Sequence, residues 1–298
     1  MDWPTLFDFT DYGELLALVR ASIFAAAVLG IVGGLVGVFV MQRDMAFAVH
    51  GISELSFAGA AGALLLGANV VLGSILGSLI AAAIIGLLGA RARDRNSIIG
   101  VLMPFGLGLG ILFLALYPGR SGNKFGLLTG QIVSVDFEQL GLLVGISVVV
   151  LAVLLVVWRP LTFDSLDPEV AAARGVPTRA LSFVFMIVLG LTVAVSVQVI
   201  GALLVLALLV TPAAAALRVS SSPVLVPVLS MLFGLVSAVG GILLAVGGSL
   251  PISPYITTIS FLIYLGARAL EHRVKAISGL RRDAGARRRL GAGSGSES

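Results

Sequence analysis

Two titratable side chains, His50 and Glu54, stand one helical turn apart inside the otherwise apolar stretch from Arg43 to Gly67. At this i, i+4 spacing they share one face of a helix. An imidazole nitrogen and a carboxylate oxygen so placed can bind one divalent cation, with water or other groups completing the shell. A charge held in hydrocarbon costs about 3 kcal/mol on insertion scales, so such residues usually face a water-filled path or a bound ion.

The pair is therefore the first candidate site, and Ser53 is a candidate oxygen ligand beside it. The structural alternative is a mutual hydrogen bond between His50 and Glu54 that only fixes the helix. For Ser53 the alternative is a bond from its hydroxyl to a backbone carbonyl of the same helix.

The composition excludes a water-soluble fold. Of 298 residues, 58% are hydrophobic and 11% are charged, and the mean hydropathy is +1.11, whereas soluble domains carry about 25% charged residues. The chain has no cysteine and two histidines, His50 and His272, which excludes disulfides, thiolate metal sites and a His-rich zinc site within one chain.

Catalytic motifs are missing as well. The sequence has no GxxxxGK[ST] phosphate loop, no GxSxG motif and no HExxH motif. We expect no catalytic residues and no enzyme activity in this chain, so the energy for active transport must come from another polypeptide or from an ion gradient.

Hydropathy predicts an all-α polytopic membrane protein, because nine segments reach roughly the 20 apolar residues that a membrane span requires. The sixth and seventh segments flank Gly201 with almost no loop, so eight spans and a re-entrant piece remain an alternative. Residues 1–14 form an N-terminal segment, 15–270 the transmembrane domain and 271–298 a basic tail that we expect to be disordered. The predicted spans are Leu15–Met41, Met45–Leu66, Val70–Ala90, Ile98–Tyr117, Gln139–Trp158, Ala180–Val199, Ala202–Leu217, Val224–Val246 and Tyr255–Leu270.

The basic residues predict the orientation. With the N-terminus outside, all but three of the 19 Lys and Arg residues fall on one side; the exceptions are Arg20, inside the first predicted span, and Arg120 and Lys124 in an outer loop. The positive-inside rule then places the C-terminus in the cytoplasm. Its charges suit contact with anionic membrane lipid rather than with nucleic acid.

The inner loop 160–179 contains a short helix signal, DPEVAAARG. Asp167 suits a helix N-cap, Pro168 suits the first helical position and Gly175 suits the stop. A short amphipathic helix on the cytoplasmic face has the shape of a docking element, and an ordinary linker is the alternative.

Four blocks of the sequence together carry a likeness to one group of transporters. They are Gly33–Gly67, Asn96–Leu114, Phe125–Asp136 and, most specifically, Asp167–Ala216, with its Asp-Pro-Glu start and its Val-x-Gly-x-Leu-Leu-Val and Pro-Ala-Ala continuation. On these blocks the chain resembles the membrane permease subunit of the zinc/manganese/iron-type bacterial ABC importers, the ABC-3 family. The likeness runs from about Ser22 to Leu270.

The resemblance implies the eight- or nine-span permease fold in a bacterial inner membrane. It also implies partners: cytoplasmic ABC ATPase subunits, a second permease copy and an extracytoplasmic solute-binding protein that delivers a divalent metal ion (zinc, manganese or iron). No cofactor bound by this chain is implied. Gln198 matches a family position that is often polar or basic, so it is a candidate lining residue, with a helix-to-helix hydrogen bond as the alternative. The residues that match the family's ATPase coupling helix are Asp167, Pro168, Glu169, Ala172 and Gly175.

One departure from the family concerns the candidate site. The family usually has Asp, three residues and then His, whereas this chain has His50 at the Asp position, Glu54 at the His position and Ala58 where proline is common. The carboxylate and imidazole are kept with their order exchanged, so the metal preference does not carry over. A metal chelate or a non-metal solute stays open as substrate. Two other functions stay open. One is an ion-coupled secondary carrier that uses Glu54 or His50 as proton acceptor, and the other is a non-transporting scaffold.

Overall fold

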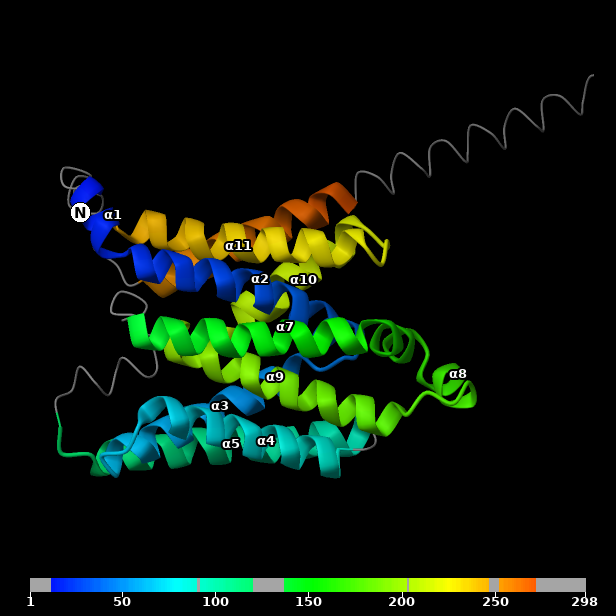
Figure 1. Ribbon diagram of the computed structural model, residues 1–298, viewed down its shortest axis with the longest axis horizontal. Helices are drawn as coiled ribbons and strands as arrows, with labels where there is room; N and C mark the ends of the chain where they lie inside the picture. Colours follow the sequence, from blue (N-terminus) through cyan, green and yellow to red (C-terminus); the bar gives the residue numbers. More distant parts are fainter. Residues whose placement is uncertain (1–11, 90–91, 120–136, 203, 247–251, 272–298) are drawn as a thin grey trace, which may run out of the picture.

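The computed structural model describes residues 12–89, 92–119, 137–202, 204–246 and 252–271. Helices and short connections make up all of these residues, and no strand occurs among them. Long helices lie side by side along one common direction, and the short helix α8 stands at one end of the bundle (Figure 1). The predicted all-α architecture is confirmed.

In the part of the chain that the structure describes, seven helices are long and apolar enough to cross a membrane: α2, α3, α4, α5, α7, α9 and α11. With the shorter α10 and a helix over residues 252–271, they give nine segments that correspond to the nine predicted spans. The bounds are α1 (Tyr12–Leu18), α2 (Arg20–Gln42), α3 (Ala46–Leu65), α4 (Val70–Leu88), α5 (Ala92–Leu116), α7 (Phe137–Leu166), α8 (Pro168–Ala173), α9 (Thr178–Ile200), α10 (Val205–Val219) and α11 (Leu225–Val246).

The structure corrects two predicted boundaries. The first span is broken at Val19, so Arg20 is the exposed first residue of α2 and does not lie inside a continuous span. Helix α7 continues past the predicted end at Trp158, through Pro160 to Leu166. Hydropathy marks where a chain leaves hydrocarbon, whereas a helix continues as long as its backbone can pair, so part of the predicted loop 160–179 is helical.

The junction between α9 and α10 is a break inside the protein. Gly201 has a φ of +84°, in the left-handed region that favours glycine, and Gly201, Ala202 and Leu204 are buried. Helix α10 has 15 residues, or about 22 Å at 1.5 Å per residue, short of the roughly 30 Å hydrocarbon layer. The seventh predicted segment is thus a short helix that begins within the bundle.

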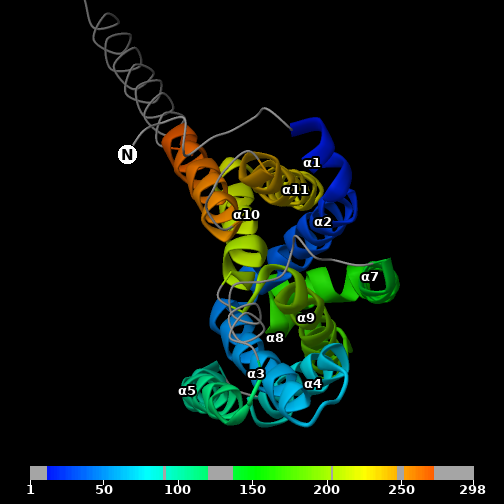
Figure 2. The same ribbon diagram turned by 90° about the vertical axis from the view of Figure 1, so that its left-hand side faces the viewer.

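Small residues bring the central helices together. Gly30 and Gly34 of α2 lie against the main chain of α11 at Gly234 and Ser230, and the Ser230 hydroxyl donates to the Gly34 carbonyl at 2.6 Å. These small-residue pairs therefore pack within the chain. Helices α2, α3 and α9 are the most buried of the long helices, and α5 and α7 lie on the flanks (Figure 2).

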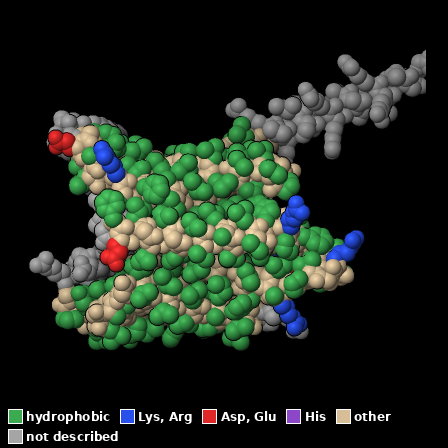
Figure 3. Space-filling view, in the orientation of Figure 1, with side chains coloured by type: hydrophobic (Ala, Val, Ile, Leu, Met, Phe, Trp, Pro, Cys, Tyr) green, Lys and Arg blue, Asp and Glu red, His purple; other side chains and the backbone are tan. Residues whose placement is uncertain are grey.

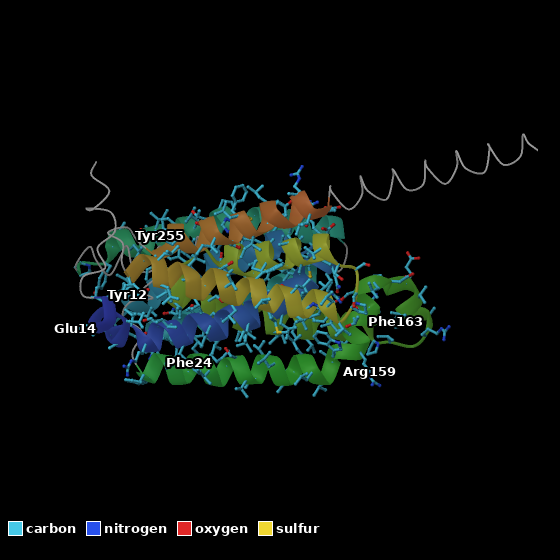
Figure 4. All side chains as sticks on the ribbon, turned by 90° about the horizontal axis from the view of Figure 1, so that it is seen from above. Tyr12, Glu14, Phe24, Arg159, Phe163 and Tyr255 are labelled. Atoms are coloured by element: carbon cyan, nitrogen blue, oxygen red, sulfur yellow. The ribbon has the colours of Figure 1, made fainter. Side chains whose placement is uncertain are left out.

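The two ends of the bundle differ in charge. Tyr12, Glu14 and Tyr255 lie at one end, and Arg159 and Phe163 lie at the other, beside α8 (Figure 4). Basic side chains on the visible face gather mainly at the α8 end, with a wide hydrophobic band between the ends (Figure 3). This is the pattern expected of a protein set across a bilayer.

Candidate functional site

His50 and Glu54 lie on one face of α3, and their side chains approach without closing a hydrogen bond. Nε2 of His50 is 3.6 Å from Oε1 of Glu54, longer than a good hydrogen bond. Within the described part of the chain, Nδ1 of His50 and Oε2 of Glu54 are buried and have no hydrogen-bond partner. The pair therefore keeps atoms that can bind a cation, and it is not the closed mutual bond of the structural alternative.

The face that carries the pair runs from the surface into the protein. The exposed fraction falls from 68% at Phe47 to 3% at Glu54, with the His50 side chain at 26% between them. Gly106 of α5 lies against the main chain at Glu54. An ion that reached His50 from outside the chain would therefore meet the buried carboxylate of Glu54 next.

A single copy of the chain brings together two side chains of the kinds that bind divalent metals. Across the described residues, no group of three or more His, Cys, Asp or Glu side chains is close enough to hold a metal ion. Divalent metals in proteins take four or more ligands. A metal ion at His50 and Glu54 would therefore need further ligands, such as water, backbone groups or a second polypeptide.

Ser53 is fully buried, and its hydroxyl donates to the backbone carbonyl of His50 at 2.8 Å. This is the carbonyl bond that the sequence offered as the alternative to a metal ligand. Ser56, on the same helix, is bonded to the hydroxyl of Ser74 at 2.7 Å, which in turn donates to the Ala194 carbonyl of α9. These hydroxyls tie helices together around the pair.

Gln198 is half-buried in α9, and its amide donates to the carbonyl of Val70, the first residue of α4, at 3.4 Å. Helix α4 begins at the end of the bundle away from α8, whereas His50 lies one turn from the start of α3 at the α8 end. The structure therefore gives Gln198 a helix-to-helix hydrogen bond and does not bring it to His50 and Glu54.

The predicted short helix is present as α8. The Asp167 carboxylate caps it by accepting from the Val170 amide at 3.0 Å, and Pro168 takes the first position. Gly175, with a φ of +82°, follows its end. Glu169 and Ala172 are exposed, so α8 presents a free outer surface at the end of the bundle.

The structure also shows a buried ion pair that the sequence did not single out. Arg43, between α2 and α3, donates to Asp164 near the end of α7 at 2.7 Å. Both residues line a cavity of about 980 Å³ at the α8 end, together with Arg95, Pro168 and others. One sequence feature pointed to this pair: Asp164 is an aspartate in an otherwise apolar and hydroxyl-bearing segment. Its partner could not be read from neighbouring residues, because Arg43 is 121 positions away.

Comparison with known proteins agrees with this fold. The pattern of the ABC 3 transport family matches residues 16–271. The manganese transport system membrane protein MntC of Halalkalibacterium halodurans is 30% identical over 76% of this chain and 78% of its own length. The high-affinity zinc uptake system membrane protein ZnuB of Haemophilus influenzae is 28% identical over 75% of this chain and 87% of its own.

A solved structure, PsaBC from Streptococcus pneumoniae in complex with Fab, superposes with a TM-score of 0.78 at 26% identity. The match covers 87% of this chain and 95% of the PsaBC chain. The family pattern, the relatives and the shared fold all span most of the chain, which is therefore a member of the ABC 3 transport family.

Proposed function

We propose that this chain is the permease subunit of an ATP-driven importer for a divalent metal ion, with zinc, manganese or iron as the substrate class. The observation that carries the proposal is the His50–Glu54 pair: two metal-binding side chains, 3.6 Å apart, on a helix apolar enough to span a membrane. The family membership and the manganese and zinc systems among the relatives support it.

Two protein ligands suit a transport site better than a storage site. Conduction requires binding that is favourable enough to admit the ion and weak enough to release it. The face of α3 that carries the pair is partly exposed at His50 and buried at Glu54. A second copy of the chain packed against this face could therefore complete the coordination shell of the ion. When that copy moves, it could withdraw its ligands again.

The same proposal assigns the partners. The chain has no phosphate loop, so ATP hydrolysis belongs to separate ABC ATPase subunits, with α8 as their docking helix. A solute-binding protein would deliver the ion at the opposite end. The gathering of arginines at the α8 end supports a position in the bacterial cell membrane with α8 and the C-terminus in the cytoplasm.

The test is cellular metal content, measured by mass spectrometry, in a deletion strain carrying either the wild-type gene or the variant Glu54→Gln. The amide has the size of the carboxylate but lacks its charge, so accumulation of one of the three metals should fall to the level of the deletion while membrane assembly is kept. Glu14→Gln is the matched control, because Glu14 is exposed at the far end of the bundle and should keep wild-type uptake.

Normal accumulation of all three metals in the Glu54→Gln strain would contradict the proposal. Uptake that continues in a strain lacking the ATPase, and that follows an imposed proton gradient, would instead identify a secondary carrier.

A further inference from the structure

The side chain of Arg43 joins three elements at the α8 end. Its guanidinium donates to Asp164 at 2.7 Å and to Ser165 at 3.2 Å on α7, and to Ser182 of α9 at 2.6 Å. It also lies over the ring of Phe185, with 5.6 Å from its central carbon to the ring centroid. The planar guanidinium has several donors in fixed directions, so these partners hold it in one place.

The position of this ion pair in the chain is as informative as its geometry. Asp164 precedes the α8 cap, Asp167, by three residues, and Arg43 precedes the first residue of α3, Ala46, by the same number. His50 follows one turn into α3. The ion pair thus links the helix that we propose as the docking element to the helix that carries the candidate metal site.

The connection from Arg43 into α3 is short and firmly held. Asp44 has a φ of +55°, and the buried Met45 donates its amide to the Val40 carbonyl at 2.9 Å. The Arg43 carbonyl accepts from Arg95 of α5 at 3.3 Å. A displacement of Arg43 would therefore move the start of α3 with it.

Helices α7 and α3 share α9 as a packing neighbour, and the turn at Arg43 is a second connection between them. Helix α7 packs chiefly against α2, α9 and α8, whereas α3 packs chiefly against α4, α5 and α9. A cavity of about 980 Å³, which Arg43, Asp164 and Pro168 line, borders the end of α7 and the start of α8.

Stability alone does not explain the pair. The side chains are 10% and 2% exposed, and a buried ion pair of this kind is often no more stabilising than well-packed apolar residues. In the described part of the chain the second oxygen of Asp164, Oδ1, has no hydrogen-bond partner. The feature that apolar residues could not provide is a directional link between α7 and the turn before α3.

We propose that Arg43 and Asp164 are positioning residues for transport: they pass the movement of α8, driven by the ATPase, to α3 and so to His50 and Glu54. This proposal rests on the proposed function. It predicts that breaking the link separates ATP hydrolysis from metal movement, without changing either binding site.

The test uses the permease purified with its ATPase and reconstituted in vesicles, with metal uptake and ATP hydrolysis measured on the same sample. Asp164→Asn should lower the metal moved per ATP about tenfold, within the usual range of coupling between sites. Hydrolysis and equilibrium metal binding should stay near wild type. A purely structural role would lower hydrolysis, binding and uptake together, and that result would overturn the proposal.

Glu271→Gln is the matched control. It breaks the Arg218–Glu271 ion pair, which is 2.8 Å long and lies at the same end, but is more exposed, at 37% and 22%. Metal moved per ATP should be unchanged. If Asp164→Asn fails to fold, the double variant Arg43→Met/Asp164→Leu removes both charges and keeps the apolar volume. That variant should assemble and remain uncoupled, and normal metal per ATP in either variant would overturn the proposal.

The two proposals fail separately. If Glu54→Gln moves metal normally, the proposed metal path is wrong. If Glu54→Gln loses metal binding while Asp164→Asn keeps normal coupling, only the role of the ion pair is wrong.

Discussion

Gly59 of α3 and Gly73 of α4 face each other so closely that a Cβ added to either would meet the other's carbonyl oxygen. Gly77, one turn further along α4, meets the α3 main chain at Leu55 in the same way. The helix that carries His50 and Glu54 is therefore held to α4 through backbone contact, and its position depends on residues that have no side chain.

Replacing Gly59 by valine should prevent this approach. It should lower the free energy of unfolding of the bundle by about 1–3 kcal/mol or more, because backbone atoms cannot move aside as a side chain can. The measurement is membrane yield and thermal stability in detergent. Gly108 of α5 is the control: nothing lies within 4 Å of an added Cβ there, so Gly108→Val should express and melt like wild type. Equal loss in both variants would contradict the packing argument.

Ser53→Ala should keep metal uptake within about twofold of wild type, because the Ser53 hydroxyl is already bonded to the His50 carbonyl and such local bonds contribute little to stability. Uptake of radioactive or isotopically enriched metal in cells provides the measurement. A loss as complete as that expected for Glu54→Gln would instead make Ser53 a ligand in a conformation that differs from this one.

Asp167→Ala should weaken the start of α8 by about 0.5–2 kcal/mol, since the Val170 amide would lose its acceptor. We expect less ATPase to co-purify with the permease and uptake to fall in proportion, while Asp167→Ser restores both. Asn69→Ala removes a comparable cap from α4 at the other end of the bundle and should leave ATPase binding unchanged. Equal ATPase recovery with Asp167→Ala would argue against docking at α8.

Gln198→Leu should cost about 0.5–1.5 kcal/mol of stability through loss of the bond to the Val70 carbonyl. The affinity for metal should not change, because the side chain is bonded at the start of α4, at the end of the bundle away from His50. Isothermal titration beside a melting curve separates the two effects. A weakened affinity at unchanged stability would place Gln198 on the metal path.

Local sequence signals located most of the helices and the α8 cap, because hydropathy and capping depend on neighbouring residues. The spacing of His50 and Glu54 also placed them correctly on one face. The Arg43–Asp164 ion pair could not be predicted in this way, since it joins residues 121 positions apart. The partner of Gln198 was equally hidden, because a polar side chain in an apolar helix shows that a partner is needed but not which one.

The end of α7 was misplaced for a different reason. Arg159 and Pro160 end the apolar run, and both are usual signs of a helix boundary at the membrane surface. Pro160 removes one backbone donor, and the helix bends near this point but continues to Leu166 (Figure 4).

The two parts of α7 make the protein sensitive to the lipid itself. The residues from Phe137 to Trp158 extend about 33 Å, close to the hydrocarbon layer of about 30 Å, and the helix bends after Arg159 toward α8 (Figure 4). Membranes of different thickness change helix tilt, so lipid chain length should change the tilt of α7 and, through its bent end, the position of α8.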